Sequence, residues 1–285
     1  MARKLLTTAP NFALFGLAVL LVVAPGAVLA QWAPVDSAGR SSGQAQAQAQ
    51  TVAARQPDRG RGIPCAKFPG GAAFIDKIDN PYLPLEPGTT YTYRASDGER
   101  TVVEVTNQTK QIIGVTTRVV RDTVSDGGGV LVEDTLDWFA QDQAGNVWYF
   151  GEDVKNYENG VLVDTEGSWE AGVAGAEPGI AMQGRLRPGQ KYAQECAPGV
   201  AEDKAQVLRL GQSLAVPYGS FDNVLVTKEW NSLDPKPVEH KFYAPCVGLI
   251  RELEVRGGDE ETVLIDVQGG ISAASAQRCG AALRR

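Results

Sequence analysis

Hydrophobic and polar residues alternate along short segments of the chain from about residue 91 onward, and these segments are rich in Val, Thr and Ile. β-Branched and aromatic residues in a two-residue alternation are typical of strands with one buried face. The pattern predicts strands at residues 101–106, 112–124, 129–142, 146–151, 161–165, 224–230, 238–243 and 262–267. Residues 199–211 are the one segment that suggests a helical turn.

The segments between these strands have the composition of tight turns. Glycine and asparagine, which tolerate positive φ, occur in "SDGGG" (Ser125–Gly129), "DQAGN" (Asp142–Asn146), "YENG" (Tyr157–Gly160) and "VRGGDE" (Val255–Glu260). Short turns between consecutive strands favour antiparallel neighbours. The sequence therefore predicts a mainly β single domain with little helix, built as a large curved antiparallel sheet or an open half-barrel.

The N-terminal region is different in composition. Residues 1–30 have a short basic start, an apolar run and a small-residue "AVLA" end, which is the pattern of a signal peptide, so the mature chain is expected to begin at Gln31. Residues 31–63 are rich in Gln, Ala, Pro and Gly and predict a disordered linker. The β-domain is expected to span residues 64–285. An uncleaved membrane anchor is the alternative for residues 1–30.

Charge and cysteine content restrict the function class. The formal net charge is −7, and signal cleavage would remove Arg3 and Lys4, which leaves −9. An acidic chain is a poor ligand for nucleic acid or anionic membranes. Four cysteines in an exported chain favour disulfide bonds, and the absence of a Cys-x-x-Cys pair argues against a zinc knuckle or a redox site. The predicted location is secreted or periplasmic, with no stable membrane span after cleavage.

Alternation within two strands singles out two polar residues. In residues 129–142, one face is apolar except for Asp134, and in residues 238–243 the chain's only histidine, His240, shares a face with Val238 and Phe242. If the apolar faces point inward, Asp134 and His240 are buried and need polar partners. Two explanations remain open: core residues satisfied by backbone groups, or a functional pair that has Glu202 or Asp203 nearby.

Other candidate residues are aromatic or acidic. Trp138, Trp148 and Trp169 crowd a short span and are candidates for lining a ligand pocket, although sheet packing explains them equally. The acidic residues between positions 133 and 153 are interpreted as solvated strand and turn carboxylates, because they lack the spacing of a calcium loop. No serine-nucleophile motif occurs. We therefore predict no metal, no cofactor and no catalytic residue.

A set of motifs resembles a known family. The segments "DNPYLPLEPG" (Asp79–Gly88), "EDTLDWFAQD" (Glu133–Asp142), "PYGSFDNVLVTKEW" (Pro217–Trp230) and "YAPCVGL" (Tyr243–Leu249) together resemble a family of secreted bacterial β-domains to which no activity is assigned. The last motif also resembles a strand entry of envelope proteins with half-barrel sheets. The resemblance implies an exported β-domain and supplies no catalytic residues.

The resemblance also suggests a disulfide pairing. Cys246 stands where such entries have glycine, and Cys196 stands where an aromatic residue is expected. Two unusual cysteines are most simply explained as one added bond, Cys196–Cys246, which leaves Cys65–Cys279 near the two ends of the domain.

These observations predict a non-catalytic, extracytoplasmic binding domain that holds an apolar or amphipathic small ligand on a concave sheet face. Its predicted ligand-binding residues are Asp134, Trp138, Trp148, Trp169 and His240. One alternative is a hydrolase-like or metal-dependent enzyme that uses inward carboxylates and His240. Another is a structural or protein-interaction module.

Overall fold

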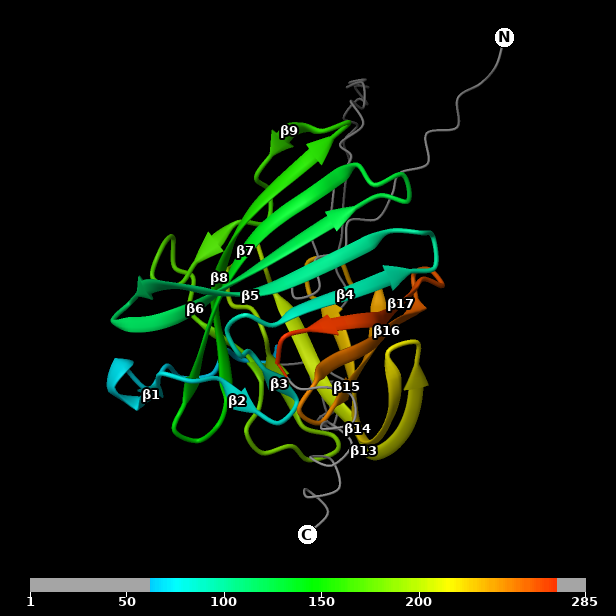
Figure 1. Ribbon diagram of the computed structural model, residues 1–285. Helices are drawn as coiled ribbons and strands as arrows, with labels where there is room; N and C mark the ends of the chain where they lie inside the picture. The colour runs from blue at the N-terminus through cyan, green and yellow to red at the C-terminus, as the bar shows by residue number, and fades with distance from the viewer. Residues whose placement is uncertain (1–61, 271–285) are drawn as a thin grey trace, which may run out of the picture. The chain divides into compact units, whose positions relative to one another are not determined.

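The structure is a computed structural model that describes residues 62–270 (Figure 1). The predicted signal peptide, most of the predicted linker and Cys279 lie outside the described residues. Within them, one short 3-10 turn, Gly71–Ala73, precedes the strands. No helix among residues 62–270 is long and apolar enough to cross a membrane.

Seventeen strands follow in chain order. They are β1 (Phe74–Ile75), β2 (Asp79–Asn80), β3 (Leu83–Pro84), β4 (Thr90–Ala95), β5 (Arg100–Ile112), β6 (Val115–Ser125), β7 (Leu131–Asp142), β8 (Val147–Glu158), β9 (Val161–Asp164), β10 (Trp169–Glu170), β11 (Gly179–Met182), β12 (Lys191–Ala193), β13 (Asp203–Val216), β14 (Gly219–Asn231), β15 (Val238–Ala244), β16 (Gly248–Arg256) and β17 (Glu261–Gln268).

Fifteen of the strands form one antiparallel sheet in the order β10-β8-β7-β6-β5-β4-β17-β16-β15-β14-β13-β12. Strand β1 pairs with β7, strands β9 and β11 pair with β8, and β2–β3 is a separate hairpin. In Figure 1 the first half of the sheet (teal to green) joins the second half (yellow to red) where β4 lies beside β17. The predicted mainly β open antiparallel sheet is confirmed.

Each of the predicted strands is present, and the predicted hairpin turns connect them. The expectation of a helical turn at residues 199–211 is wrong, because β13 begins at Asp203 and pairs with β14 along its length. Ala205 and Val207 are fully buried in this strand, so tertiary pairing outweighs the local helical preference. Gly211, with φ +75°, lies where the β13–β14 register shifts.

The two ends of the sheet approach each other at β11 and β12. The backbone N–H of Glu177 donates to the carbonyl of Cys196 at 2.9 Å. A Cβ atom at Gly179 would lie 2.0 Å from the carbonyl oxygen of Gln194, so only glycine permits this approach. The contact sets the segment that contains Gln194 and Glu195 against β8 and β11.

Apolar side chains already fill much of the inner face. Several large ones are completely enclosed: Phe139, Tyr149, Leu225, Ile250 and Leu264. A packed core of this kind has few gaps larger than a water molecule. The chain's own side chains therefore occupy this part of the inner face, where the apolar ligand was predicted to bind.

The disulfide pairing differs from the prediction. Cys65 is bonded to Cys196, with a Cα–Cα distance of 6.1 Å, and Cys246 is also disulfide-bonded. Both predicted pairs, Cys196–Cys246 and Cys65–Cys279, are therefore wrong. The physical reason is that Cys196, which follows β12, is bridged to Glu177 just before β11, and the N-terminal segment with Cys65 passes within bonding distance there.

Candidate functional site

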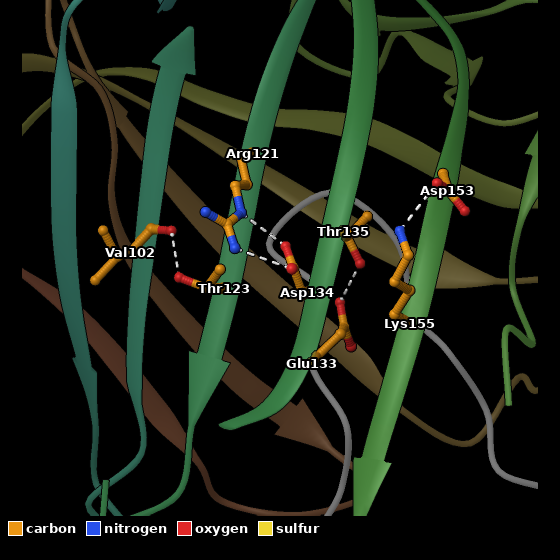
Figure 2. A network of polar contacts seen from close by, with 8 residues as sticks. All are labelled: Val102, Arg121, Thr123, Glu133, Asp134, Thr135, Asp153 and Lys155. Atoms are coloured by element: carbon orange, nitrogen blue, oxygen red, sulfur yellow. Dashed lines mark hydrogen bonds and ion pairs between the residues drawn. The ribbon is translucent and has the colours of Figure 1, made fainter. Parts of the chain in front are cut away.

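The face of strand β7 that points inward is the opposite of the one predicted. Glu133, Thr135 and Asp137 are the buried residues, while Asp134 lies on the other face. Its carboxylate accepts hydrogen bonds from the Arg121 guanidinium at 2.8 and 2.9 Å, and Thr135 Oγ1 donates to Glu133 Oε1 at 2.8 Å (Figure 2). Asp134 is thus a partly exposed ion-paired residue and not an inward polar exception.

Strand β15 shows the same inversion. Glu239, Lys241 and Tyr243 are buried, and His240 lies on the opposite face, directly across from Lys228 of β14. Partial burial lowers the pKa of His240, and the nearby cations Arg209 and Lys228 lower it further. The predicted pairing of His240 with an acidic residue is therefore wrong, because its charged neighbours are cations.

Long cationic side chains cover the apolar residues that lie on the outer face of the sheet. Lys110 Nζ lies 3.3 Å from the centroid of the Trp138 ring, and the Arg251 guanidinium lies 5.1 Å from the ring of Phe242. Such side chains cover apolar surface with their stems while their charged ends stay near water. An apolar face can therefore point outward in this sheet.

The inward polar residues form what we call the carboxyl cluster: Glu133, Asp137, Glu152, Glu195 and Asp203. All five are less than about a tenth exposed and come from β7, β8, the segment after β12, and the start of β13. The earlier interpretation of Glu133, Asp137 and Glu152 as solvated carboxylates is wrong. The inward alternation of β7 and β8 buries them.

Hydrogen bonds join members of the carboxyl cluster in pairs. The Tyr149 hydroxyl donates to Asp137 Oδ1 at 2.5 Å and also hydrogen-bonds Glu152. Glu195 and Asp203 are hydrogen-bonded to each other. A hydrogen bond between two carboxyl groups requires a proton on one of them. The Glu195–Asp203 pair therefore holds a proton.

Burial dominates the ionisation of this cluster. It raises the pKa of Asp137 to about 7, with a further increase from Glu133. Burial and neighbouring carboxylates also raise the pKa values of Glu152 and Glu195 well above the ordinary range. For Glu152 and Glu195 the strongest charged neighbours are other carboxyls and not cations. Ionisation of the cluster is thus opposed by desolvation and by repulsion together.

Several buried polar atoms at the cluster have no hydrogen-bond partner among the described residues. They are Glu133 Oε2, Asp137 Oδ2, Glu195 Oε1 and Trp169 Nε1. Trp169 packs edge-on against Tyr149, which places its indole beside the cluster. Buried polar groups without partners are costly and indicate a bound species that the protein atoms do not supply. A species bound here must interact with the carboxyl oxygens and also accept a hydrogen bond from Trp169 Nε1.

A second group, the lysine cluster, lies on strands β14 to β16 and comprises Glu229, Glu239, Lys241 and Glu252. Lys241 Nζ lies 3.5 Å from a carboxylate oxygen of Glu229, 3.5 Å from one of Glu239 and 3.3 Å from one of Glu252. All four side chains are buried. One cation therefore faces three acids.

A shared proton reduces the negative charge of the lysine cluster. Glu229 accepts hydrogen bonds from Thr227, Tyr243 and Gln194, at 2.6, 3.0 and 3.2 Å. Glu239 and Glu252 are hydrogen-bonded to each other, and burial raises the pKa of Glu252 to about 8. Burial alone would lower the pKa of Lys241, but the surrounding carboxylates raise it, so the amine stays charged.

The Lys241→Met variant tests this account. It removes the cation and leaves the acids buried, so we expect a loss of about 3 kcal/mol in unfolding free energy at neutral pH, measured by urea titration. The loss should shrink near pH 5, where protonation neutralises the acids. Lys228→Met, on the opposite face of β14, is the control and should cost less than about 1 kcal/mol. Equal effects of the two variants would contradict the account.

A small cavity connects the two clusters. It has a volume of about 20 Å³ and is lined by Asp203 of the carboxyl cluster, by Glu229, Glu239 and Lys241 of the lysine cluster, and by Asn231. This volume is enough for roughly one water-sized species. Residues of both clusters thus line one polar cavity at the start of β13 and the end of β14.

The predicted tryptophans separate into three environments. Trp169 lies beside the carboxyl cluster, as described above. Trp148 packs against Phe68 and Phe74 and donates from Nε1 to Asp142 at 2.8 Å. Trp138 lies under Lys110 on the outer side. The three tryptophans therefore do not line one pocket, and only Trp169 contributes to the candidate site.

The acids proposed as partners of His240 are also dispersed. Glu202 accepts a hydrogen bond from the backbone of Gly199, whereas Asp203 belongs to the carboxyl cluster. The one group of His, Cys, Asp and Glu side chains among the described residues with ligand atoms close enough to enclose a metal is Asp97, Glu99 and Glu260, at the ends of β4, β5 and β17. Its atoms lie within 4.8 Å of one another. We call it the surface acidic group.

Sequence reasoning missed the carboxyl cluster. Its signal was present in the series Glu133, Thr135, Asp137 and Phe139, which places two acids and an aromatic residue on one face of β7. Without the direction of that face, the series is equally typical of a solvated surface.

No family model matches the chain, and no curated protein matches it. Two solved structures show partial similarity in fold. One, a protein from Bacteroides fragilis described as exported and as having a YmcC-like fold, has 13% sequence identity and a TM-score of 0.38, with 66% of this chain and 99% of that chain covered. The other, from Parabacteroides distasonis and described as a lipoprotein, has 13% identity and a TM-score of 0.38, with 68% and 100% covered. The family resemblance in the motifs stays a prediction.

Proposed function

We propose that this chain is an extracytoplasmic, non-catalytic binding domain that takes up a divalent cation at the carboxyl cluster. The observation that carries the proposal is the set of buried carboxyls with oxygens that lack partners, namely those of Glu133, Asp137 and Glu195. The signal-like N-terminus and the Cys65–Cys196 disulfide support an oxidising compartment.

The cluster favours a cation over the apolar ligand expected from the sequence. Apolar side chains already occupy the neighbouring inner face, whereas the carboxyls repel one another and would gain from a positive charge. Calcium and magnesium prefer oxygen ligands, and magnesium commonly keeps several waters while it binds through one or two carboxylates. Among the described residues, no three ligand atoms of the carboxyl cluster lie close enough together to enclose an ion, so the cation would bind through one or two carboxyls and keep its waters.

Water on such a cation would also serve the remaining polar atoms. A metal-bound water donates to carboxylates, and its oxygen or a further water accepts from Trp169 Nε1, which otherwise lacks a partner. The cavity beside Asp203 offers room for one such water.

Thermal unfolding of chelator-treated protein tests the proposal. Millimolar calcium or magnesium near pH 8 should raise the Tm by about 5 °C or more, because a ligand at a hundred times its Kd adds about 2.7 kcal/mol. Sodium chloride at matched ionic strength should not. The shift should be small near pH 5, where protons occupy the carboxyls.

Three variants assign the shift. Glu195→Gln should abolish it, while Glu158→Gln, an exposed residue at the end of β8, should leave it unchanged. Glu260→Gln alters the surface acidic group. A shift that survives Glu195→Gln and disappears in Glu260→Gln would place the cation at the surface acidic group and overturn the proposal.

A further inference from the structure

A groove lies on the outer side of the sheet, where the end of the β13–β14 hairpin crosses the strands β4, β17 and β16. It has a volume of about 460 Å³, and its walls include Leu214, Val216, Pro217, Val263, Arg94 and Arg251. We call it the outer groove. Its volume falls within the range of small-ligand sites, roughly 300–1,000 Å³.

The bend of the hairpin produces the outer groove. The β13–β14 register shifts at three places, between Val207 and Leu214, and such irregularities bend and twist a strand pair. The backbone N–H of Tyr218 then donates to the carbonyl of Leu264 in β17 at 3.2 Å, which fixes the hairpin end against that strand.

The outer groove lies on the face opposite the buried acids. Arg251 follows directly before Glu252, whose side chain is in the lysine cluster, so the alternation of β16 points Arg251 the other way. Val263 is directly across from Arg251, and Arg94 is directly across from Val263, so these three share the outer face. The outer groove and the carboxyl cluster are therefore separated by the sheet.

The walls combine apolar side chains with an excess of positive charge. Two arginines and one glutamate line the outer groove. Arg251 Nε lies 2.7 Å from Glu261 Oε1 and its guanidinium lies against Phe242, so this arginine is held in place and neutralised. Arg94 makes no ion pair with another described residue and faces Arg100 directly across the β4–β5 pair.

This arrangement favours an anionic group at Arg94. Like charges directly opposite each other in a sheet are destabilising. An anion bound near Arg94 in the outer groove would therefore reduce the repulsion between Arg94 and Arg100. Arginine binds carboxylate with two parallel hydrogen bonds where geometry allows. The apolar walls supplied by Leu214, Val216 and Pro217 would contact a hydrocarbon chain.

We propose that the outer groove binds an amphiphile with one carboxylate and a linear hydrocarbon chain, of the fatty-acid class, with its head group at Arg94. The ligand class expected from the sequence is thus assigned to the face opposite the predicted one. The proposal is independent of the cation site, because the two sites share no residue.

Displacement of a dansyl-labelled undecanoic acid tests the proposal on the intact protein, below the concentrations at which micelles form. Dodecanoate should displace the probe, dodecanol should displace it at least about tenfold more weakly, and dodecyltrimethylammonium should not displace it. Arg94→Gln should weaken probe binding by about tenfold, since a charged hydrogen bond is lost. Added salt should weaken binding to the unmodified protein.

Matched variants separate the outer groove from general adsorption. Arg185→Gln removes another exposed arginine outside the outer groove and should leave probe binding unchanged. Leu214→Asp should abolish binding while near-UV circular dichroism stays that of the folded protein. Glu195→Gln should have no effect. Equal displacement by the cationic amphiphile, or equal loss in Arg94→Gln and Arg185→Gln, would overturn the proposal.

Discussion

The protein without added divalent cation is expected to become less stable as the pH rises from about 5 to about 8, by roughly 5 kcal/mol in unfolding free energy or roughly 10 °C in Tm. Most exported acidic proteins would change little across this range, because their solvated carboxyls are already ionised. The effect here comes from carboxyls whose folded-state pKa is raised: Glu99, Glu133, Asp137, Glu152, Glu195, Glu239, Glu252, Glu254 and Glu260.

The direction of this effect follows from proton binding. A carboxyl with a raised folded-state pKa holds its proton in the folded protein at a pH where the unfolded chain has lost it. Its contribution to stability is fully present below the unfolded value, near 4.5, and is lost as the pH rises through the folded value. That value is about 7 for Asp137 and about 8 for Glu252. His240, whose pKa is lowered, contributes in the opposite direction as a single group.

Urea titrations at several pH values, with chelator present, measure the slope. Glu152→Gln should reduce the slope, because the amide is neutral at every pH, and this variant should be more stable than the unmodified protein near pH 8. Glu158→Gln on the same strand should keep the original slope. Stability that rises with pH between about 5 and 8 would show that the buried carboxyls are ionised and otherwise compensated.

The proposed cation changes the same slope. If a divalent cation binds the ionised carboxyls, its stabilising effect grows as protons leave, so saturating calcium or magnesium should reduce the loss of stability toward pH 8. The cation dependence and the part of the pH dependence that comes from the carboxyl cluster would thus report one competition between protons and the cation.

Strand positions and hairpins could be predicted from the sequence because their causes are local. Asn159 and Gly160 adopt positive φ in the turn between β8 and β9, as the Asn-Gly signal indicates. β-Branched residues and alternation define where β5, β6 and β7 run. The large antiparallel sheet then follows from short connections between consecutive strands.

The direction of the strand faces could not be predicted in the same way. Alternation shows that Asp134 and Asp137 lie on opposite faces of β7, but apolar residues occur on both faces. Two long-range facts decide the matter: Lys110 covers Trp138 on the outer side, and Tyr149 hydrogen-bonds Asp137 on the inner side. The residues next to Asp137 in the sequence do not indicate either contact. The usual preference for apolar residues inside predicted the opposite orientation of the strand faces.

The disulfide is the second feature with a large expected effect on stability. The double variant Cys65→Ala/Cys196→Ala should lose about 5 kcal/mol of unfolding free energy, since the bond closes a loop across a sequence separation of 131 residues. Replacing both partners leaves no new free thiol. Non-reducing peptide mapping of the unmodified protein should show Cys65 linked to Cys196.

The urea m-value should show that this loss of stability originates in the unfolded chain. Removing a cross-link lets the unfolded chain expand, so the urea m-value should increase while far-UV circular dichroism of the folded state stays the same. A loss below about 1 kcal/mol would mean that the bond does not constrain the unfolded chain. Because Glu195 directly precedes Cys196, the bond also holds one member of the carboxyl cluster in the segment after β12. The double variant should therefore show a smaller cation-induced rise in Tm than the unmodified protein, which would connect the covalent constraint to the proposed binding site.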